Sequence, residues 1–451
     1  MAGRGARSSS PTSCIGRWRN LSASFLLLLF CSLRVAFVAS DADFIPGPEA
    51  QGMQFSEEEA NKPAGPPTSL VNDITRANGR TGPPPPTNSW GIVQTRKTQF
   101  ITPDRKNFYV NGYNSWGLAG RGGTPEGRQR VINLLDAGQA LGLTVVRIMA
   151  GNLGAFVVQS GPSNFSETAL RDFDWLMNEC SKRQIRLLVM FGNNWSIKLQ
   201  YQSWLPANER GTSEDVFYTN PRAKSWFKGL LSKVITRNNT VNGIKYSDDP
   251  TVFGWQLLNE PRCNSDKTGA SLISWTSEMA AFVKSLDRKH MVSIGSEGFY
   301  GPSLPQRVYA NSGPGWPAEQ GNDFVAEHRV ANIDFVTVHL YAQLWMGETD
   351  DAKFVFADKW LKAHLQDGRG GIKKPMLIEE FGWMTDIPKR DLMFRQVFAY
   401  SLNATKAGYS AGTLFWSFED HDGTWNVNFN THASTLKIVK EHSDNLRKLS
   451  R

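Results

Sequence analysis

A carboxylate and an amide stand side by side at the end of an apolar stretch near the middle of the chain. The stretch runs Trp255-Gln-Leu-Leu-Asn-Glu-Pro-Arg-Cys263 and breaks at Pro261. Such a run is typical of a buried strand, with Asn259 and Glu260 at its carboxyl end. In a barrel of parallel strands, the carboxyl ends of the strands build the active site. A turn that only caps a strand is the plainer interpretation, so a catalytic role requires a second carboxylate.

That second carboxylate follows a later apolar run, Lys374-Pro-Met-Leu-Ile-Glu-Glu-Phe-Gly382. Because neighbours on a strand point to opposite sides, we expect at most one of Glu379 and Glu380 to face the pocket. Glycoside hydrolysis uses such a pair, one carboxyl protonated to release the leaving oxygen and one ionised to attack the anomeric carbon. A structural ion pair is the alternative for either glutamate.

Three further polar residues occur at strand ends. Arg147 lies within an apolar run, and a buried arginine needs a carboxylate partner. His339 and Tyr341 are two residues apart and therefore on one face of a strand, although a core histidine is equally consistent with the pattern. We expect Arg147 and the Tyr341 hydroxyl to keep Glu380 ionised, while Glu260 stays protonated until the leaving group takes its proton.

Short apolar runs alternate with amphipathic stretches after Thr95, which indicates βα units and a parallel sheet. The predicted helices include 126–141, 167–183, 271–287 and 390–407. The predicted strands are 108–113, 144–149, 185–191, 251–258, 291–294, 335–339, 376–380 and 412–416. Eight strands over about 330 residues predict an α/β fold of the (β/α)8 TIM barrel type. A doubly wound open sheet is the alternative, but no Gly-x-Gly-x-x-Gly follows the first strand.

The N-terminal part of the chain has a different composition. Residues 1–40 hold five arginines and no acidic residue, an apolar stretch at 25–33, and small residues at 38–40. This pattern predicts a secretory signal peptide, with an uncleaved anchor or a transit peptide as alternatives. Residues 41–95 are rich in proline and predict a disordered leader, followed by a catalytic domain over 96–445. A secreted, extracellular location in the cell wall is therefore expected.

Charge and cysteine content exclude several classes of protein. The formal charge of +8 falls to about +3 without residues 1–40, and no basic tract remains to bind nucleic acid. Only Cys180 and Cys263 lie beyond the predicted signal, so a disulfide-dense scaffold is excluded, and their pairing stays open. Glycosylation sequons begin at Asn164, Asn238 and Asn403. Asn194-Trp-Ser also matches, but Asn194 is assigned to the active site.

The motifs together resemble glycoside hydrolase family 5. They are Asn-Glu-Pro after strand four, His-x-Tyr after strand six, Glu-Phe-Gly after strand seven and Trp416 after strand eight. Asn-Glu-Pro-Arg-Cys with Glu297-Gly-Phe-Tyr-Gly301 and Asn193-Asn-Trp195 is similar to plant and fungal endo-β-1,4-mannanases. The resemblance extends from about Thr95 to Ser443.

The resemblance implies a role for each matching residue. Glu260 would be the general acid/base and Glu380 the nucleophile of a retaining reaction. Asn259 would bind the sugar 2-hydroxyl, Arg262 would contact sugars on the leaving side, and Trp416 would form the floor where the bond is cleaved. The remaining expected substrate contacts are Arg147, Asn194, Trp195, His339, Tyr341 and Trp345. No metal or cofactor is implied, and the expected partner is a mannan-type polysaccharide bound by a monomer.

One position departs from the family pattern. Met149 stands two residues after Arg147, where an aromatic residue is expected, which leaves the preferred backbone sugar open. The competing functions are a β-1,4-glucanase, a mannan transglycosylase and a catalytically silent carbohydrate-binding barrel. The presence of both Glu260 and Glu380 argues against the silent protein.

Overall fold

The structure is a computed structural model that describes residues 90–151, 157–313, 315–347 and 349–450. These residues all belong to one compact unit, Glu57–Arg451. The predicted signal peptide at 1–40 and residues 41–89 of the predicted leader lie outside the described residues. Every predicted strand is present, so the predicted (β/α)8 barrel is confirmed.

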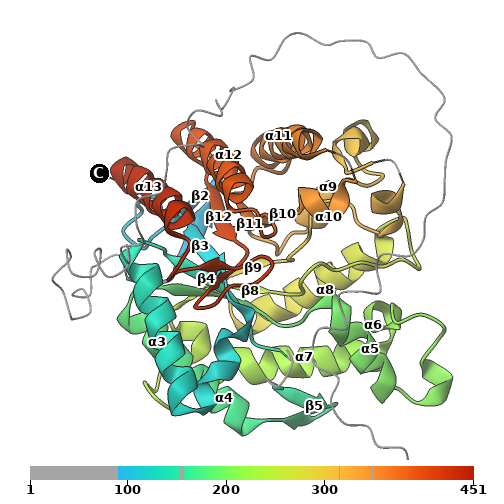
Figure 1. Cartoon of the computed structure of the whole chain (residues 1–451). Coiled ribbons are helices and arrows are strands. Elements are labelled where there is room, and N and C mark those ends of the chain that lie inside the picture. The colour runs from blue at the N-terminus through green and yellow to red at the C-terminus, as the bar shows by residue number, and fades with distance from the viewer. Residues whose placement is uncertain (1–89, 152–156, 314, 348, 451) are drawn as a thin grey trace, which may run out of the picture. The chain divides into compact units, whose positions relative to one another are not determined.

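Eight parallel strands form a nearly closed barrel surrounded by helices (Figure 1). Their order around the barrel is β10-β11-β12-β3-β4-β7-β8-β9. The last strand of the barrel, β12, pairs with its first strand, β3, and Thr413 lies opposite Asn111. The gap between β9 and β10 is bridged by Asp334 N donating to Val292 O over 2.8 Å and by His339 N donating to Glu297 O over 3.0 Å. The barrel strands are β3 (Asn111–Asn114), β4 (Val145–Met149), β7 (Arg186–Met190), β8 (Val252–Gln256), β9 (Met291–Ser293), β10 (Val336–Leu340), β11 (Met376–Phe381) and β12 (Ala411–Phe415).

Most of the long helices begin at a polar cap. The Thr124, Ser166, Asn220, Thr349 and Asp386 side chains accept hydrogen bonds from backbone N–H groups in the first turn of the following helix. The helices are α3 (Pro125–Ala140), α4 (Glu167–Lys182), α5 (Asn194–Trp204), α6 (Val216–Thr219), α7 (Pro221–Ile235), α8 (Ala270–Leu286), α9 (Phe324–His328), α10 (Ala342–Trp345), α11 (Asp350–Asp367), α12 (Ile387–Lys406) and α13 (Ala433–Leu449). All four predicted helices are present, as α3, α4, α8 and α12.

Three short two-stranded sheets lie outside the barrel, two of them antiparallel and one parallel. They are β1 (Gln94–Arg96) with β2 (Gln99–Ile101), β5 (Gln159–Gly161) with β6 (Asn164–Phe165), and β13 (Phe418–Glu419) with β14 (Val427–Asn428). Phe100 of β2 is buried among inward-facing side chains at the amino end of the barrel, including Phe253 and Phe335 at ring distances of 5.3 and 5.6 Å. This hairpin closes the barrel at the end opposite the candidate active site.

Packed residues extend slightly beyond the predicted 96–445 domain at both ends. Val93 is buried in the same cluster as Phe100, and the Trp90 ring lies 4.3 Å from the Arg186 guanidinium. At the other end, α13 continues to Leu449.

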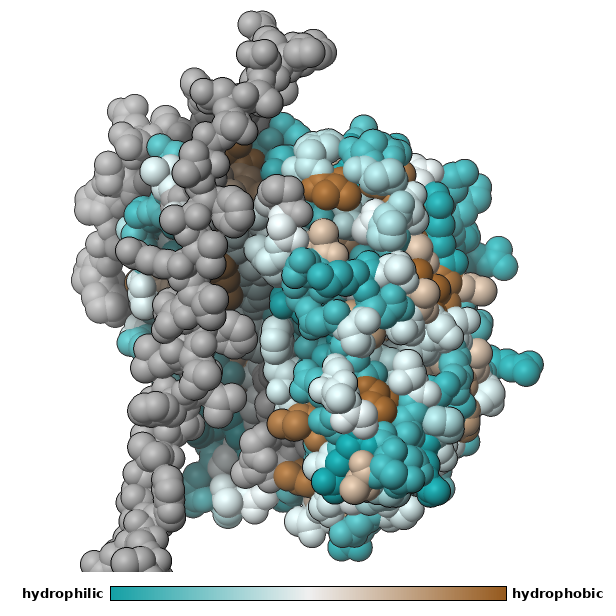
Figure 2. Space-filling model, turned by 90° about the vertical axis from the view of Figure 1, so that its right-hand side faces the viewer, coloured by the Kyte–Doolittle hydropathy of each residue, from teal (hydrophilic) through white to brown (hydrophobic). Residues whose placement is uncertain are grey.

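In the described residues, both cysteines are unpaired and the surface visible in Figure 2 is mainly hydrophilic. Cys180 and Cys263 are both buried and free. In these parts of the chain, no helix is long and apolar enough to cross a membrane. Hydrophilic residues dominate the face of the barrel unit visible in Figure 2, and hydrophobic residues are scattered among them.

Candidate active site

Glu260 is positioned by a strained backbone immediately after β8. Its φ of +47° lies in the left-handed region, which a non-glycine residue adopts only when its surroundings impose it. The backbone is fixed from both sides, since Glu260 N donates to Gly295 O and Asn259 N donates to Gly192 O, each over 2.8 Å. Pro261 follows Glu260, and the chain leaves the barrel strand there. In this conformation the carboxylate lies between His339 and Trp195, each 2.8 Å away.

Arg147 of β4 is fully buried and organises the floor of the site. Its Nη1 donates to Glu380 Oε1 over 2.5 Å, and its Nη2 donates to Asn259 Oδ1 over 2.7 Å. Nη1 also reaches Asn114 Oδ1 at 3.0 Å, and Nε reaches Gln256 Oε1 at 2.6 Å. One planar guanidinium therefore fixes four side chains on or just after three strands, β3, β8 and β11, and Glu380 is the carboxylate partner that the sequence predicted.

Both glutamates of β11 reach this network, contrary to the expected alternation. Glu379 Oε2 lies 3.6 Å from Arg147 Nε, and Glu379 Oε1 lies 3.2 Å from His339 Nε2. Glu380 Oε2 accepts a 2.6 Å hydrogen bond from Tyr341 and lies 3.7 Å from His339 Nδ1. The register between β10 and β11 shifts at His339, so the regular side-to-side alternation is lost there. Glu379 is wholly buried and Glu380 retains slight exposure, which makes Glu380 the more accessible carboxylate.

His339 joins the two candidate catalytic groups. Its Nδ1 lies 2.8 Å from Glu260 Oε1, so the imidazole is held between Glu260 on one side and Glu379 on the other. Burial lowers the pKa of His339, but the charge of Glu380 and the hydrogen bonds to Glu260 and Glu379 outweigh burial and raise it to about 10. The imidazole is therefore protonated at neutral pH in this arrangement.

The pKa values of the two carboxyls shift in the directions opposite to those predicted. Burial raises the pKa of Glu260, but the hydrogen bond and charge of His339 outweigh it and lower the pKa to about 2. Burial raises the pKa of Glu380 above its usual value despite the charges of His339 and Arg147. The charge of His339 thus favours the ionised form of Glu260, whereas the sequence predicted a protonated Glu260. The sequence placed His339 near the pair but could not show it wedged between two carboxylates.

An aromatic and cationic wall borders Glu260. Trp195, at the start of α5, is 50% exposed and donates through Nε1 to Glu260 Oε2 over 2.8 Å. The Arg262 guanidinium lies 4.8 Å from the Trp195 ring centroid. Both Glu297 oxygens accept from Arg262, at 2.7 and 2.8 Å, so Arg262 is a held cation and not a solvated loop residue. Burial raises the pKa of Glu297 to about 7 in spite of Arg262.

Of the remaining predicted site residues, Asn194 is buried, and Trp345 and Trp416 are partly buried. Asn194 is buried, and its Oδ1 accepts from the Tyr218 hydroxyl and from Arg262 N, each at 3.2 Å, so it supports the loop that carries Arg262. Trp345 is partly buried against Phe299 at 5.1 Å. Trp416 is also partly buried, and its N donates to Phe381 O over 2.8 Å, beside the strand end that carries Glu380.

Sequence reasoning missed four residues of the network. No local motif distinguishes Gln256 and Asn114 from other buried polar residues. Glu297 begins the Glu-Gly-Phe-Tyr-Gly motif, but the motif did not indicate its pairing with Arg262. The fourth, Trp425, packs edge to face on Tyr341 at a ring distance of 5.0 Å. The Trp425 ring also lies close to Gly382, where an added Cβ would be 3.2 Å from it. Its position in the loop after β12, like that of Trp416, is the signal that could have found it.

Two groups of side chains have ligand atoms close enough together to hold a metal ion. In the described residues these are Glu260, His339 and Glu380, and the consecutive run Glu419-Asp420-His421. In the first group, Arg147 and Tyr341 already bind both oxygens of Glu380. In the second, Arg121 and Arg130 pair with Glu419 and Asp420 at 2.6 Å. Cationic partners in these positions oppose a metal ion, so the donor sets do not fit one.

The barrel and its paired strand-end carboxylates define the class of barrel glycoside hydrolases. The family model described as GH family 5 beta-mannosidase-like matches residues 91–436. The chain belongs to this family, and it is a glycoside hydrolase.

Relatives and solved structures agree with this assignment. The chain is 36% identical to mannan endo-1,4-beta-mannosidase 1 of Oryza sativa subsp. japonica, with 80% of this chain and 87% of the relative covered. It is 39% identical to mannan endo-1,4-beta-mannosidase 2 of Arabidopsis thaliana, with 72% and 78% covered. The endo-1,4-beta-mannanase of Rhizomucor miehei is similar in structure, with a TM-score of 0.63, 27% identity, and 79% and 99% covered.

Proposed function

We propose that this glycoside hydrolase is an endo-acting retaining enzyme that cleaves internal β-1,4-mannosidic bonds of mannan, glucomannan and galactomannan. The relatives named as mannan endo-1,4-beta-mannosidases support the substrate class. The observation that carries the retaining mechanism is the closeness of the two carboxylates. Oxygen atoms of Glu260 and Glu380 lie within 4.8 Å of each other. Retaining enzymes hold their carboxyl groups about 5–5.5 Å apart, whereas inverting enzymes leave about 6.5–9.5 Å for a water molecule.

In the first half of the proposed reaction, Glu380 attacks the anomeric carbon and the bond to the leaving oxygen breaks. The leaving oxygen takes a proton from Glu260. This proton is held at rest in the 2.8 Å hydrogen bond between His339 Nδ1 and Glu260 Oε1. As Glu380 becomes an ester it loses its charge, which removes a main support of the imidazolium. The pKa of His339 then falls, and the proton passes through Glu260 to the leaving group.

In the second half, ionised Glu260 accepts a proton from water, and the resulting hydroxide attacks the anomeric carbon. The ester bond breaks and Glu380 regains its charge. That charge again raises the pKa of His339, so the proton returns to the imidazole and the starting state is restored. Asn259 binds the sugar 2-hydroxyl beside the nucleophile in this proposal, which its 2.7 Å hydrogen bond from Arg147 supports by fixing the side chain.

Substrate on the leaving side is proposed to lie on the wall formed by Trp195 and Arg262. The Trp195 ring is half exposed, and its indole N–H is already directed at Glu260. The apolar face of a sugar suits such a ring, and the Arg262 guanidinium offers hydrogen-bond donors at its edge. On the other side, Met149 is fully buried, so an aromatic wall there must come from elsewhere. Trp416, bonded to Phe381 beside Glu380, and Trp425, packed on Tyr341, are the candidates.

Secretion is part of the same proposal. The basic start, the apolar stretch at 25–33 and the small residues at 38–40 support a signal peptide over 1–40. Residues 41–89 then form a proline-rich leader before the barrel, and the enzyme acts outside the cell on wall polysaccharide.

Product analysis tests the proposed function. The secreted protein is incubated with mannan, glucomannan and cellulose, each with and without added mannooligosaccharides. Short mannooligosaccharides from mannan are the expected result. Lengthened acceptors as the main product would favour a transglycosylase, and products from cellulose alone would make the enzyme a glucanase. Polymer binding without any product would contradict an enzyme function.

A further inference from the structure

A hollow of about 560 Å³ lies between α11 and α12, on the outer face of the barrel. Three of its lining residues, Tyr400, Asn403 and Ala404, share one face of α12 because they are three and four positions apart. Leu365 and Arg369 face them from α11 and the turn that follows it. The hollow is therefore a groove between two parallel helices, with mixed apolar and polar walls.

A buried hydroxyl at this groove lacks a partner. Tyr409 lines the hollow and is only 1% exposed, yet its hydroxyl has no hydrogen-bond partner among the described residues. By contrast, the Tyr400 hydroxyl on the wall donates to Asp358. The Tyr409 hydroxyl is itself buried and packs against Gly368, where a Cβ would lie 2.2 Å from it, so it is not open to a ligand in the groove. The groove is lined by apolar Leu365 and Ala404 and by polar Arg369 and Asn403, and these mixed walls suit a sugar with hydroxyl and amide groups around an apolar ring face.

The rim of the groove carries an attachment point for such a sugar. Asn403 is exposed, lines the hollow, and begins the sequon Asn403-Ala-Thr405. We propose that Asn403 carries an N-linked glycan whose first N-acetylglucosamine occupies this groove. In the transfer, the Asn403 amide nitrogen bonds to the anomeric carbon of a lipid-diphosphate-linked oligosaccharide. The bond from that carbon to the diphosphate breaks, the diphosphate leaves with the electron pair, and the amide loses a proton.

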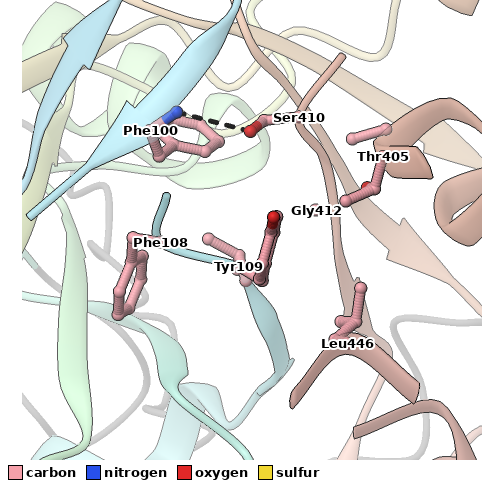
Figure 3. Close-up of a pocket in the computed structure, with 9 residues that line it drawn as sticks. Phe100, Phe108, Tyr109, Thr405, Ser410, Gly412 and Leu446 are labelled. Atoms are coloured by element: carbon pink, nitrogen blue, oxygen red, sulfur yellow. Dashed lines mark hydrogen bonds between the residues drawn. The ribbon is translucent and has the colours of Figure 1, made fainter. Parts of the chain in front are cut away.

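The fold restricts when this transfer happens. Thr405 is only 8% exposed and lines a different pocket, together with Ser410, Gly412 and Leu446 (Figure 3). Residues two positions apart on a helix point about 200° apart, so Asn403 faces the groove while Thr405 faces the interior. The sequon hydroxyl is thus inaccessible once α12 has docked. Glycosylation of Asn403 precedes the docking of α12 and occurs on the emerging chain.

The other three sequons provide internal comparisons. Asn164 in β6 and Asn238, which forms an isolated bridge with Lys245, are both exposed, so both can carry a glycan without entering this groove. Asn194 is buried and its side chain is bonded by Tyr218, so a glycan there is incompatible with the folded site. The inference rests on the proposed secretion, because only a secreted chain meets the oligosaccharide donor.

Glycopeptide mapping of the full-length chain secreted from a eukaryotic host tests the site. Glycans at Asn403, with Asn194 unmodified, are expected. Glycans at Asn164 and Asn238 but not at Asn403 would overturn this inference alone. Absence of glycans at all three sites would overturn it together with secretion, while hydrolysis of mannan by the same sample would leave the enzymatic proposal standing.

Thermal unfolding tests the groove. The variant N164Q/N238Q, glycosylated only at Asn403, is compared with N164Q/N403Q, glycosylated only at Asn238. Each is treated with an endoglycosidase that leaves one N-acetylglucosamine, or with an amidase that removes the glycan entirely. For the Asn403 glycan, the trimmed form is expected to keep its midpoint and the stripped form to lose about 2–4 °C. For the Asn238 glycan, both treatments should give equal midpoints. Equal thermal midpoints for the trimmed and stripped Asn403 forms would contradict the proposal that the first N-acetylglucosamine occupies the groove.

Discussion

Replacement of Arg147 by lysine tests whether one planar cation organises the site. The guanidinium donates to four buried oxygen atoms, on Gln256, Asn114, Glu380 and Asn259, at distances of 2.5–3.0 Å. These acceptors lie along different edges of the plane. An ammonium group has three N–H donors at a single point and can satisfy at most three of the four.

The structure sets the expected size of the effect. One or two buried acceptors lose their donor in R147K, and each such loss costs about 1–3 kcal/mol of stability. Loss of the fixed geometry of Glu380 and Asn259 removes contacts that act on the reacting sugar. Such contacts are typically worth about 100- to 1,000-fold in kcat, or about 2.7–4 kcal/mol. We expect a fall of this size in kcat on an aryl mannoside, with a smaller effect on KM.

A matched control separates catalysis from stability. Arg186 is equally buried on the adjacent strand β7, but it lies at the amino end of the barrel, where it donates to Pro250 O. R186K is expected to lower the free energy of unfolding in urea while kcat stays within about threefold of wild type. Wild-type kcat in R147K, or an equal loss of kcat in both variants, would refute the reasoning.

Four further changes have defined outcomes. E260Q should slow both chemical steps, and an activated aryl leaving group should partly rescue the first; no rescue would contradict the acid role. H339N should move the basic limb of the kcat/KM pH profile to lower pH. In the wild type the proton shared with Glu260 is held by His339, whose pKa is raised to about 10, and in the variant only Glu260 can hold it. A basic limb at the wild-type pH would show that His339 does not hold the proton. Burial raises the pKa of Glu327 to about 7, so its stabilising effect is present below about pH 4.5 and is lost as the pH rises through 7. Between pH 4.5 and 8, the free energy of unfolding in urea should fall by on the order of 3 kcal/mol more in the wild type than in E327Q. An equal dependence of this free energy on pH in the two proteins would contradict the prediction. Activity should survive dialysis against a chelator, and its loss, with recovery on adding a divalent cation, would reveal a metal requirement.

The sequence predicted the barrel well because strand periodicity is a local property. Each apolar run is four to eight residues long and is followed by an amphipathic segment, so strand positions can be found without knowing their neighbours. The same holds for Glu260 and Glu380, since the carboxyl end of each strand is marked by a proline or a glycine nearby. Parallel strands bring all these ends to one side of the barrel.

Contacts across the barrel could not be predicted in the same way. Gln256 and Glu379 lie 123 positions apart and meet at 2.7 Å, and nothing in either local pattern indicates the other. The direction of the Glu260 pKa shift could not be predicted for the same reason, because it depends on His339, which lies 79 positions away. The register shift at His339 is set by the pairing of β10 with β11 and so breaks the alternation rule that either strand alone would obey.

Trapping of the glycosyl-enzyme tests the central claim most directly. The protein is incubated with an activated 2-deoxy-2-fluoro-β-mannoside, which slows the second step more than the first, and peptides are then mapped by mass spectrometry. The account predicts one fluorosugar per molecule, attached to the peptide at Glu380, and no adduct in E380A. An adduct on Glu260 or Glu379, or turnover of mannan with inversion and no adduct, would contradict it.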